Sequence, residues 1–175
     1  VRSRVARMLT NPQLDLRSHF DLVIMDAPPR LSLASANALR ATRYIIIPSK
    51  LQPLSALPVA KMFNYLDTVK KRVGAKFQVA GVVCNMTQGA TARGTETQAL
   101  AEITRAVDAL AARPNQAPRG PAAVSPVVYT KFIPDLANIG RPPAGVPIGY
   151  FLSGKEGQEV RAIFDPLAAE IAEQI

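Results

Sequence analysis

The stretch FDLVIMDAPP, Phe20–Pro29, decides how the rest of the chain is interpreted. Four apolar residues in a row, Leu22 to Met25, are typical of a strand that is buried on both faces in a parallel sheet. Pro28 and Pro29 fix the backbone angle φ and remove two backbone donors, so the strand must end before them. The stretch therefore predicts a buried strand with Asp26 at its carboxyl end.

Asp26 is the first candidate functional residue. In open α/β folds the carboxyl ends of the strands border the crevice in which ligands bind. Mg²⁺ is commonly held there by one or two carboxylates together with the phosphates of a substrate. The alternative is that Asp26 caps the helix expected near Ser32 or accepts hydrogen bonds from nearby backbone amides. The residues alone leave both interpretations open.

The composition describes an ordinary globular protein. The 175 residues suit a single domain, 48% of them are hydrophobic and 19% are charged. No apolar run approaches the roughly 20 residues of a membrane-spanning helix. Val1 is followed by Arg2, Arg4 and Arg7 without an apolar run, which argues against a secretory signal. A single cysteine, Cys84, excludes an internal disulfide and fits a reducing cytosol.

The charge balance is strongly basic. Lys and Arg number 21 against 13 Asp and Glu, which gives a net charge of +8. Such an excess favours acidic partners, nucleic acid first, although a well-solvated basic surface has the same signature.

Apolar strand patterns alternate with helical patterns along the chain. The expected strands cover residues 22–25, 44–48, 77–84 and 126–133, and the expected helices cover 1–9, 32–42, 54–73, 95–112 and 156–175. Pro58 fits the first turn of its helix, 11–19 is expected to be a loop, and the last helix is expected to kink or split at Asp165–Pro166. This alternation predicts an α/β fold, with a mostly parallel sheet and helices on both faces.

Several short motifs resemble those of one family in order and spacing. They are FDLVIMDAPP, NAL at 37–39, IIIP at 45–48, GVVCNM at 81–86, TKFIPDLANI at 130–139 and GVPI at 145–148. Together they are similar to the ParA/MinD family, dimerising deviant-Walker ATPases that segregate plasmids and chromosomes or position cellular machinery. The resemblance extends from about residue 18 into the last helix.

The resemblance assigns roles to two groups of residues. It implies that Asp26 is the Walker B carboxylate, which holds Mg²⁺ through water, and that Pro28 and Pro29 belong to the second switch. It also implies that Asn85 recognises adenine, since a side-chain amide offers both a donor and an acceptor to a base edge.

The same resemblance implies that Pro134 and Asp135 line the pocket for the base. The residues alone favour an ordinary turn asparagine at Asn85, and they allow Pro134 equally well to be a strand terminator.

The family's phosphate loop has no counterpart in these residues. The nearest string is GYFLSGKE at 149–156, which places Glu156 where a Ser or Thr hydroxyl should reach Mg²⁺. Bulky Tyr150, Phe151 and Leu152 also stand where backbone amides must curl around an anion. We interpret the string as a coincidence. The chain, 1–175 as a single domain, is therefore expected to be the C-terminal part of a ParA-type, P-loop NTPase-like domain without its first strand and phosphate loop.

The expected function is that of a plasmid or chromosome partition ATPase, inactive in this fragment. The resemblance implies ATP and Mg²⁺ as cofactors, an ATP-bound homodimer, non-specific DNA, a centromere-binding adaptor protein and a place on the nucleoid in the cytoplasm. No membrane partner is expected, because the apolar residues of the last helix suit core packing. The alternatives are a non-enzymatic basic relative that binds DNA or a partner, and a MinD-like positioning ATPase. Arg93, Lys131 and Arg141, in or near loops at the carboxyl ends of strands, are the candidate DNA contacts.

Overall fold

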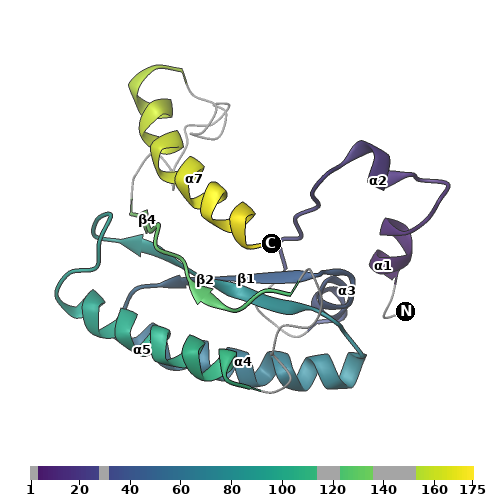
Figure 1. Cartoon of the computed structure of the whole chain (residues 1–175), viewed down its shortest axis with the longest axis horizontal. Coiled ribbons are helices and arrows are strands. Elements are labelled where there is room, and N and C mark those ends of the chain that lie inside the picture. Colours follow the sequence, from purple (N-terminus) through teal and green to yellow (C-terminus); the bar gives the residue numbers. More distant parts are fainter. Residues whose placement is uncertain (1–3, 28–31, 114–122, 136–152) are drawn as a thin grey trace. The chain divides into compact units, whose positions relative to one another are not determined.

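A computed structural model describes residues 4–27, 32–113, 123–135 and 153–175 (Figure 1). Its contacts divide the chain into two compact units, each of which is described by itself. Unit 1 contains Val1–Ile45 and Met62–Gln78, and unit 2 contains Ile46–Lys61 and Val79–Ile175. The single-domain organisation expected from the sequence stays a prediction.

The sheet is built around strand β2, Gln78–Thr87. The strand order is β1 (Tyr44–Lys50), β2 and β3 (Val127–Val128), and β4 (Ile133–Pro134) also pairs with β2. Both β3 and β4 run parallel to β2, with Gly81 opposite Val127 and Asn85 opposite Ile133. The predicted α/β class with a parallel sheet is therefore confirmed.

Strand β2 is buried on both faces. Its residues from Val79 to Cys84 are all buried, and Val82 and Cys84 have no exposed surface. Gly81 is required within this run, because a Cβ there would lie 2.3 Å from the backbone oxygen of Val127. The unbroken apolar pattern of the third predicted strand thus identified the central strand of the sheet.

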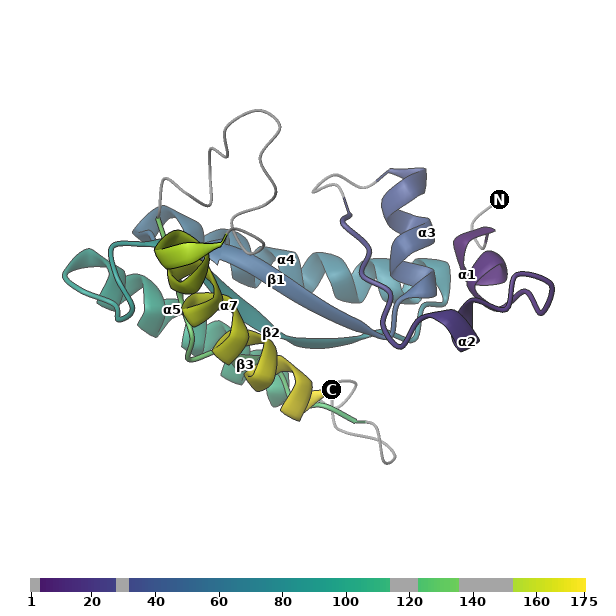
Figure 2. The ribbon, with the colours of Figure 1, turned by 90° about the horizontal axis from the view of Figure 1, so that it is seen from above.

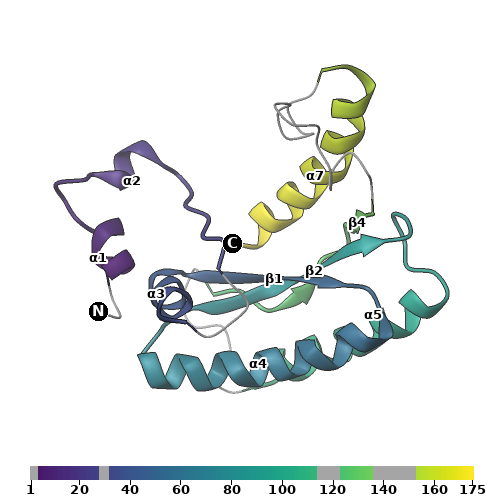
Figure 3. The same ribbon diagram turned by 180° about the vertical axis from the view of Figure 1, so that it is seen from behind.

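In unit 2, helices α5 (Thr95–Ala111) and α7 (Gly154–Gln174) lie on opposite faces of the sheet (Figure 3). The buried face of α5 carries Ala99, Ile103, Val107 and Leu110. Leu167 of α7 packs with Val83 and Tyr129 in a small apolar cluster. Helix α7 runs through Pro166 as one helix, so the expected split there is wrong.

The end of α7 is fastened to the sheet by polar contacts. Gln174 Nε2 donates to Ala80 O at 2.8 Å and to Ser125 O at 2.7 Å, and the Tyr129 hydroxyl donates to Gln174 Oε1. Burial, and then the nearby Glu170 carboxylate, raise the pKa of Tyr129 to about 12, which keeps this hydroxyl protonated. The sequence pattern predicted the helix but not this anchorage.

Unit 1 contains α1 (Arg4–Leu9), α2 (Leu16–His19), α3 (Leu33–Ala41) and the end of α4 (Pro53–Val73). Ser32 caps α3 by accepting a hydrogen bond from Ser35 N at 3.1 Å. Helix α1 lies beside α3 (Figure 2), where Arg4 N donates to Asn37 Oδ1 at 3.1 Å. The one-turn helix α2 falls in the segment expected to be a loop.

The predicted strand at Leu22–Met25 is wrong. These residues have no regular secondary structure and pair with no strand among the described residues, and Leu22, Val23 and Ile24 are 64%, 47% and 83% exposed. The reason is that an apolar run becomes a buried strand only where neighbouring strands satisfy its backbone groups. Apolarity is a local property, whereas such neighbours come from elsewhere in the chain.

Three smaller differences have related causes. Strand β1 has only one described neighbour, so it is half-buried, with Ile46 37% exposed. Helix α4 begins at Pro53, which places Pro58 inside the helix rather than in its first turn. The single strand expected at 126–133 forms two short pieces, β3 and β4, each paired with a different part of β2.

Candidate functional site

The structure brings together three of the residues implicated by sequence, at the carboxyl end of β2. Asn85 lies opposite Ile133, and Thr87 lies opposite Pro134 in the parallel pairing of β2 with β4. Asp135 N then donates to Thr87 O at 2.9 Å. Asn85 therefore lies in the same corner of unit 2 as Pro134 and Asp135, although it is far from both in the sequence.

Asn85 adopts a turn geometry in this corner. Its Oδ1 accepts a hydrogen bond from Met86 N at 2.7 Å, and Met86 has a left-handed backbone with φ of 53°. The side chain of Asn85 is half-buried. A carbonyl oxygen has two lone pairs, so Oδ1 keeps one for a further donor. The local turn and a contact with a base edge are thus compatible.

A buried carboxylate that sequence reasoning missed holds the loop after β2. Glu96 is 4% exposed, and it accepts hydrogen bonds from Gln88 N at 2.8 Å and Arg93 N at 3.2 Å. Thr87 closes the same loop by donating from Oγ1 to Gly89 O at 2.7 Å. The available signal was an acidic residue, Glu96, in the first turn of α5, where a carboxylate can accept hydrogen bonds from backbone N–H groups.

Cys84, one residue before Asn85, has no reactive character. The side chain is buried, and burial, followed by the charge of Glu96, raises the pKa of its thiol to about 11. The thiolate is therefore essentially absent at neutral pH, which makes Cys84 part of the core.

Asp26 is exposed in unit 1, directly after the apolar run Leu22–Met25. No group of three or more His, Cys, Asp or Glu side chains that could hold a metal ion occurs among the described residues. A single carboxylate with water and phosphate ligands remains chemically suited to Mg²⁺. Pro28, Pro29 and Arg141 lie outside the described residues.

The near-match to a phosphate loop gains no support from its described part. Gly154, Lys155 and Glu156 form the first turn of α7, and residues 149–152 lie outside the described residues. Lys155 is exposed, and its Nζ lies 3.9 Å from Glu159.

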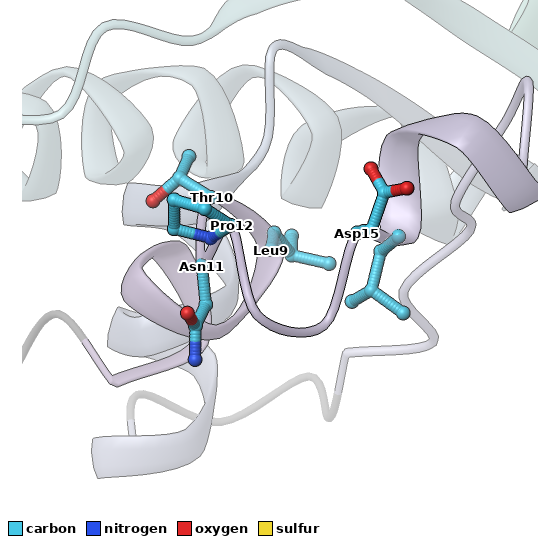
Figure 4. A pocket seen from close by; sticks show the side chains of 6 residues that line it. Leu9, Thr10, Asn11, Pro12 and Asp15 are labelled. Atoms are coloured by element: carbon cyan, nitrogen blue, oxygen red, sulfur yellow. The ribbon is translucent and has the colours of Figure 1, made fainter.

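Two pockets in unit 1 involve none of the predicted site residues. The smaller, of about 220 Å³, is lined by residues around the end of α1 and the start of α2, with Leu9, Asn11 and Asp15 labelled in Figure 4. The larger, of about 510 Å³, has Phe20, Asp21, Arg40 and Arg43 in its wall.

Comparison with known proteins identifies the same family as the motifs. A family model described as an AAA domain matches residues 3–79. The chromosome-partitioning ATPase Soj of Thermus thermophilus is 29% identical over 80 residues, which are 46% of this chain and 32% of that protein. The sporulation initiation inhibitor protein Soj of Bacillus subtilis is 26% identical over 81 residues, again 46% and 32% of the two chains.

A third relative is the chromosome partitioning protein ParA of Myxococcus xanthus, which is 27% identical over 71 residues, 41% of this chain and 25% of that protein. The matched stretch spans about a third of the length of the Soj relatives. No solved structure matches the chain.

Within the described part of the chain, every helix is too short or too polar to cross a membrane. The parallel sheet, the AAA domain match and the partitioning relatives agree with the motifs, and they confirm the predicted P-loop NTPase-like α/β class. The chain is a relative of the ParA/MinD family of partition ATPases.

Proposed function

We propose that this chain supplies the Walker B carboxylate and the base-recognition corner of a ParA-type partition ATPase. The observation that carries the proposal is the meeting of Asn85 with Pro134 and Asp135 at the carboxyl end of β2. This is the edge of a parallel sheet at which nucleotides are bound in α/β folds. The chain's kinship with chromosome-partitioning proteins supports the same assignment.

In this proposal each residue has a separate task. The Asn85 amide recognises adenine, and the backbone of Pro134 and Asp135 forms one wall for the base. Asp26 holds Mg²⁺ through water, and Pro28 and Pro29 move with the state of the nucleotide. Mg²⁺ would supply charge stabilisation for phosphoryl transfer.

The complete protein would use this site to control assembly on DNA. ATP would close a homodimer that binds non-specific DNA on the nucleoid, and a centromere-binding adaptor would link it to cargo. Arg93 and Lys131 are exposed in unit 2 and remain the proposed contacts, together with Arg141.

Two observations bear on the alternative functions. Leu167 and Ile171 of α7 pack against Val83 and Tyr129, so this apolar face is used in the core rather than offered to a membrane. This favours partitioning over a MinD-like positioning role. The net charge of +8 supports the other alternative, a non-enzymatic basic relative. A measurement of nucleotide binding distinguishes this alternative from the ATPase.

The test is a nucleotide titration of the 175-residue chain. Because these residues contain no phosphate-loop motif, we expect calorimetry to detect no micromolar binding of ATP. Millimolar adenosine should still shift the NMR signals of the Asn85 side-chain amide and the Asp135 backbone amide. Guanosine should not do so.

The matched variants are Asn85→Ala, which should lose the adenosine response, and the exposed Gln98→Ala, which should keep it. An adenosine response that survives Asn85→Ala would refute the base-recognition role. Tight ATP binding would refute the requirement for a separate phosphate loop.

A further inference from the structure

The larger pocket of unit 1 combines an apolar wall with basic side chains. Its volume of about 510 Å³ lies within the range of roughly 300–1,000 Å³ that is usual for small-molecule sites. Its lining residues all belong to Val1–Ile45, so the pocket lies within one unit. They come from the end of α1, the start of α2, the segment before Asp26 and the end of α3. Such a pocket needs a ligand with both an apolar and a polar part.

The apolar part of the wall comes from five large side chains, Leu9, Leu16, Phe20, Val23 and Met25. Phe20 is 58% exposed and Val23 is 47% exposed, so apolar surface in this wall remains in contact with water. Contiguous exposed apolar surface is typical of sites that bind a ligand or a partner. An apolar group that covered these side chains would gain free energy by removing their surface from water.

Two arginines give the pocket its charge. Arg40, in the last turn of α3, and Arg43, just before β1, line the wall together with the Asp21 carboxylate. Two cations against one anion leave the described wall with a net positive charge. Arg43 lies over the ring of Tyr44, 5.5 Å from the ring centre. Because a guanidinium has five N–H donors, contacts of this kind within the chain leave donors for a ligand.

The threonine hydroxyls of the wall are already used within the chain. Thr10 Oγ1 donates to Ala6 O at 2.9 Å, and Thr42 Oγ1 donates to Tyr44 O at 2.8 Å. The arginines are therefore the lining groups best suited to the polar end of a ligand. A guanidinium matches a planar carboxylate with two parallel N–H···O bonds.

The charge of the whole unit also favours an anion. Unit 1 contains 11 Lys and Arg residues and 4 Asp and Glu residues, a net charge of +7. Unit 2 contains 10 and 9, a net charge of +1. Anionic ligands are thus attracted to the unit that contains the pocket.

We propose that this pocket binds an amphipathic carboxylate, and that its ligand class is the medium-chain fatty acids. The carboxylate contacts Arg40 and Arg43, and the aliphatic chain covers Phe20, Val23 and Met25. Phe20 contributes the single aromatic ring of the described wall, so a flexible chain suits the wall better than a stacked ring does. The site goes beyond the proposed ATPase function, because it uses none of the residues assigned to adenine or Mg²⁺.

The experiment is a titration of the full 175-residue chain with decanoate, followed by calorimetry and by the NMR signals of the Val23 and Arg43 backbone amides. Each CH₂ group should tighten binding about threefold, so octanoate should bind about tenfold more weakly than decanoate. Acetate, which lacks the tail, and decan-1-ol, which lacks the charge, should both bind much more weakly. Equal affinity for decanoate and decyltrimethylammonium would overturn the proposal.

The arginine variants test the polar end of the site. Arg40→Gln combined with Arg43→Gln should weaken decanoate binding about tenfold or more, because charged hydrogen bonds are lost. The matched control combines Arg7→Gln and Arg72→Gln, which removes two exposed charges of unit 1 outside the pocket wall and should preserve the affinity. Arg40→Lys combined with Arg43→Lys keeps the charge and should retain part of the affinity. Equal losses in the test and control variants would contradict the site.

Single substitutions test the wall itself. Asp21→Asn should tighten decanoate binding roughly threefold, because it removes a like charge. Val23→Ser should weaken binding about threefold, whereas Leu22→Ser, next to it in the same exposed run, should not. Urea unfolding verifies that each variant is folded. An unchanged affinity in both Asp21→Asn and Val23→Ser would refute the assignment.

Two further measurements separate this proposal from its neighbours. Binding to phosphatidylglycerol vesicles without binding of free decanoate would overturn the pocket ligand and identify a membrane surface instead. The adenosine response of the Asn85 side-chain amide is read in the same spectra. Its presence or absence tests the proposed function alone, so the two proposals fail separately.

Discussion

At the scale of single residues, Glu96 shows how a buried carboxylate organises the candidate base site. Its two oxygens accept backbone N–H groups from both ends of the segment between Gln88 and Arg93. That segment follows Thr87, the last residue of β2, so its conformation influences how the last side chains of the strand are presented. Glu96 is only 4% exposed, and the two hydrogen bonds from backbone N–H groups offset the cost of burying its carboxylate.

Replacing Glu96 should loosen this loop before it affects the rest of the fold. Glu96→Ala leaves two N–H groups without their acceptor, and we expect it to lower the free energy of unfolding by about 1–3 kcal/mol. Urea unfolding measures that loss, and amide hydrogen exchange should become faster at Gln88 and Arg93. The control is Glu102→Ala in the same helix, which should change neither quantity. Unaltered exchange at both amides in Glu96→Ala would contradict the role of the carboxylate.

Asp26 presents the opposite case, a carboxylate whose removal should cost the fold nothing. The residue is exposed and follows a segment that pairs with no strand in the described part of the chain. In the complete protein, Asp26→Ala should therefore keep the parental unfolding midpoint and abolish Mg²⁺-dependent ATP hydrolysis. Turnover at the parental rate would eliminate the Walker B role, and loss of folding would favour the capping interpretation.

At the scale of elements, two of the apolar runs that predicted strands differ in their burial. The run in β2 is the central strand, paired with β1 on one side and with β3 and β4 on the other. The run at Leu22–Met25 has the same local character but remains exposed. The difference is that β2 has neighbouring strands to pair with, whereas Leu22–Met25 has none among the described residues.

This difference predicts how the chain responds to truncation of an isoleucine. Ile24 is 83% exposed, so Ile24→Ala should change the free energy of unfolding by no more than about 0.5 kcal/mol. The matched control is Ile103→Ala in α5, where a fully buried side chain should cost about 2–5 kcal/mol. Chemical denaturation of both variants measures the contrast. Similar large losses would mean that the segment is a buried strand after all.

At the scale of the whole molecule, the two units carry different properties. Unit 2 contains most of the sheet and the corner formed by Asn85, Pro134 and Asp135, and it is close to neutral. Unit 1 contains Asp26, both pockets and nearly all of the net positive charge.

Variants of the complete, ATP-bound protein can show whether Arg93 and Arg141 contribute to DNA binding. If Arg93 and Arg141 each contact one phosphate, replacing both with Ala should flatten the salt dependence by about two log–log units. The loss of affinity should be equal on unrelated duplexes. The same salt titration measures both effects, with Lys155→Ala as an exposed control. An unchanged slope would mean that the DNA contacts lie at residues other than Arg93 and Arg141.

The sequence by itself determined the elements whose pattern is local. The apolar periodicities located α3, α4, α5, α7 and β2. The ordered motifs indicated a resemblance to partition ATPases, and such proteins are among the relatives of the chain. These features follow from propensity and spacing, which neighbouring residues set without help from the rest of the chain.

The tertiary structure decided everything that depends on distant partners. It left Leu22–Met25 unpaired, because strand formation needs backbone donors and acceptors from other strands. It revealed Glu96 as the support of the loop after β2, because burial of a charge is visible only once its surroundings are known. It brought Asn85 beside Pro134 and Asp135, since proximity in space is set by packing rather than by position along the chain.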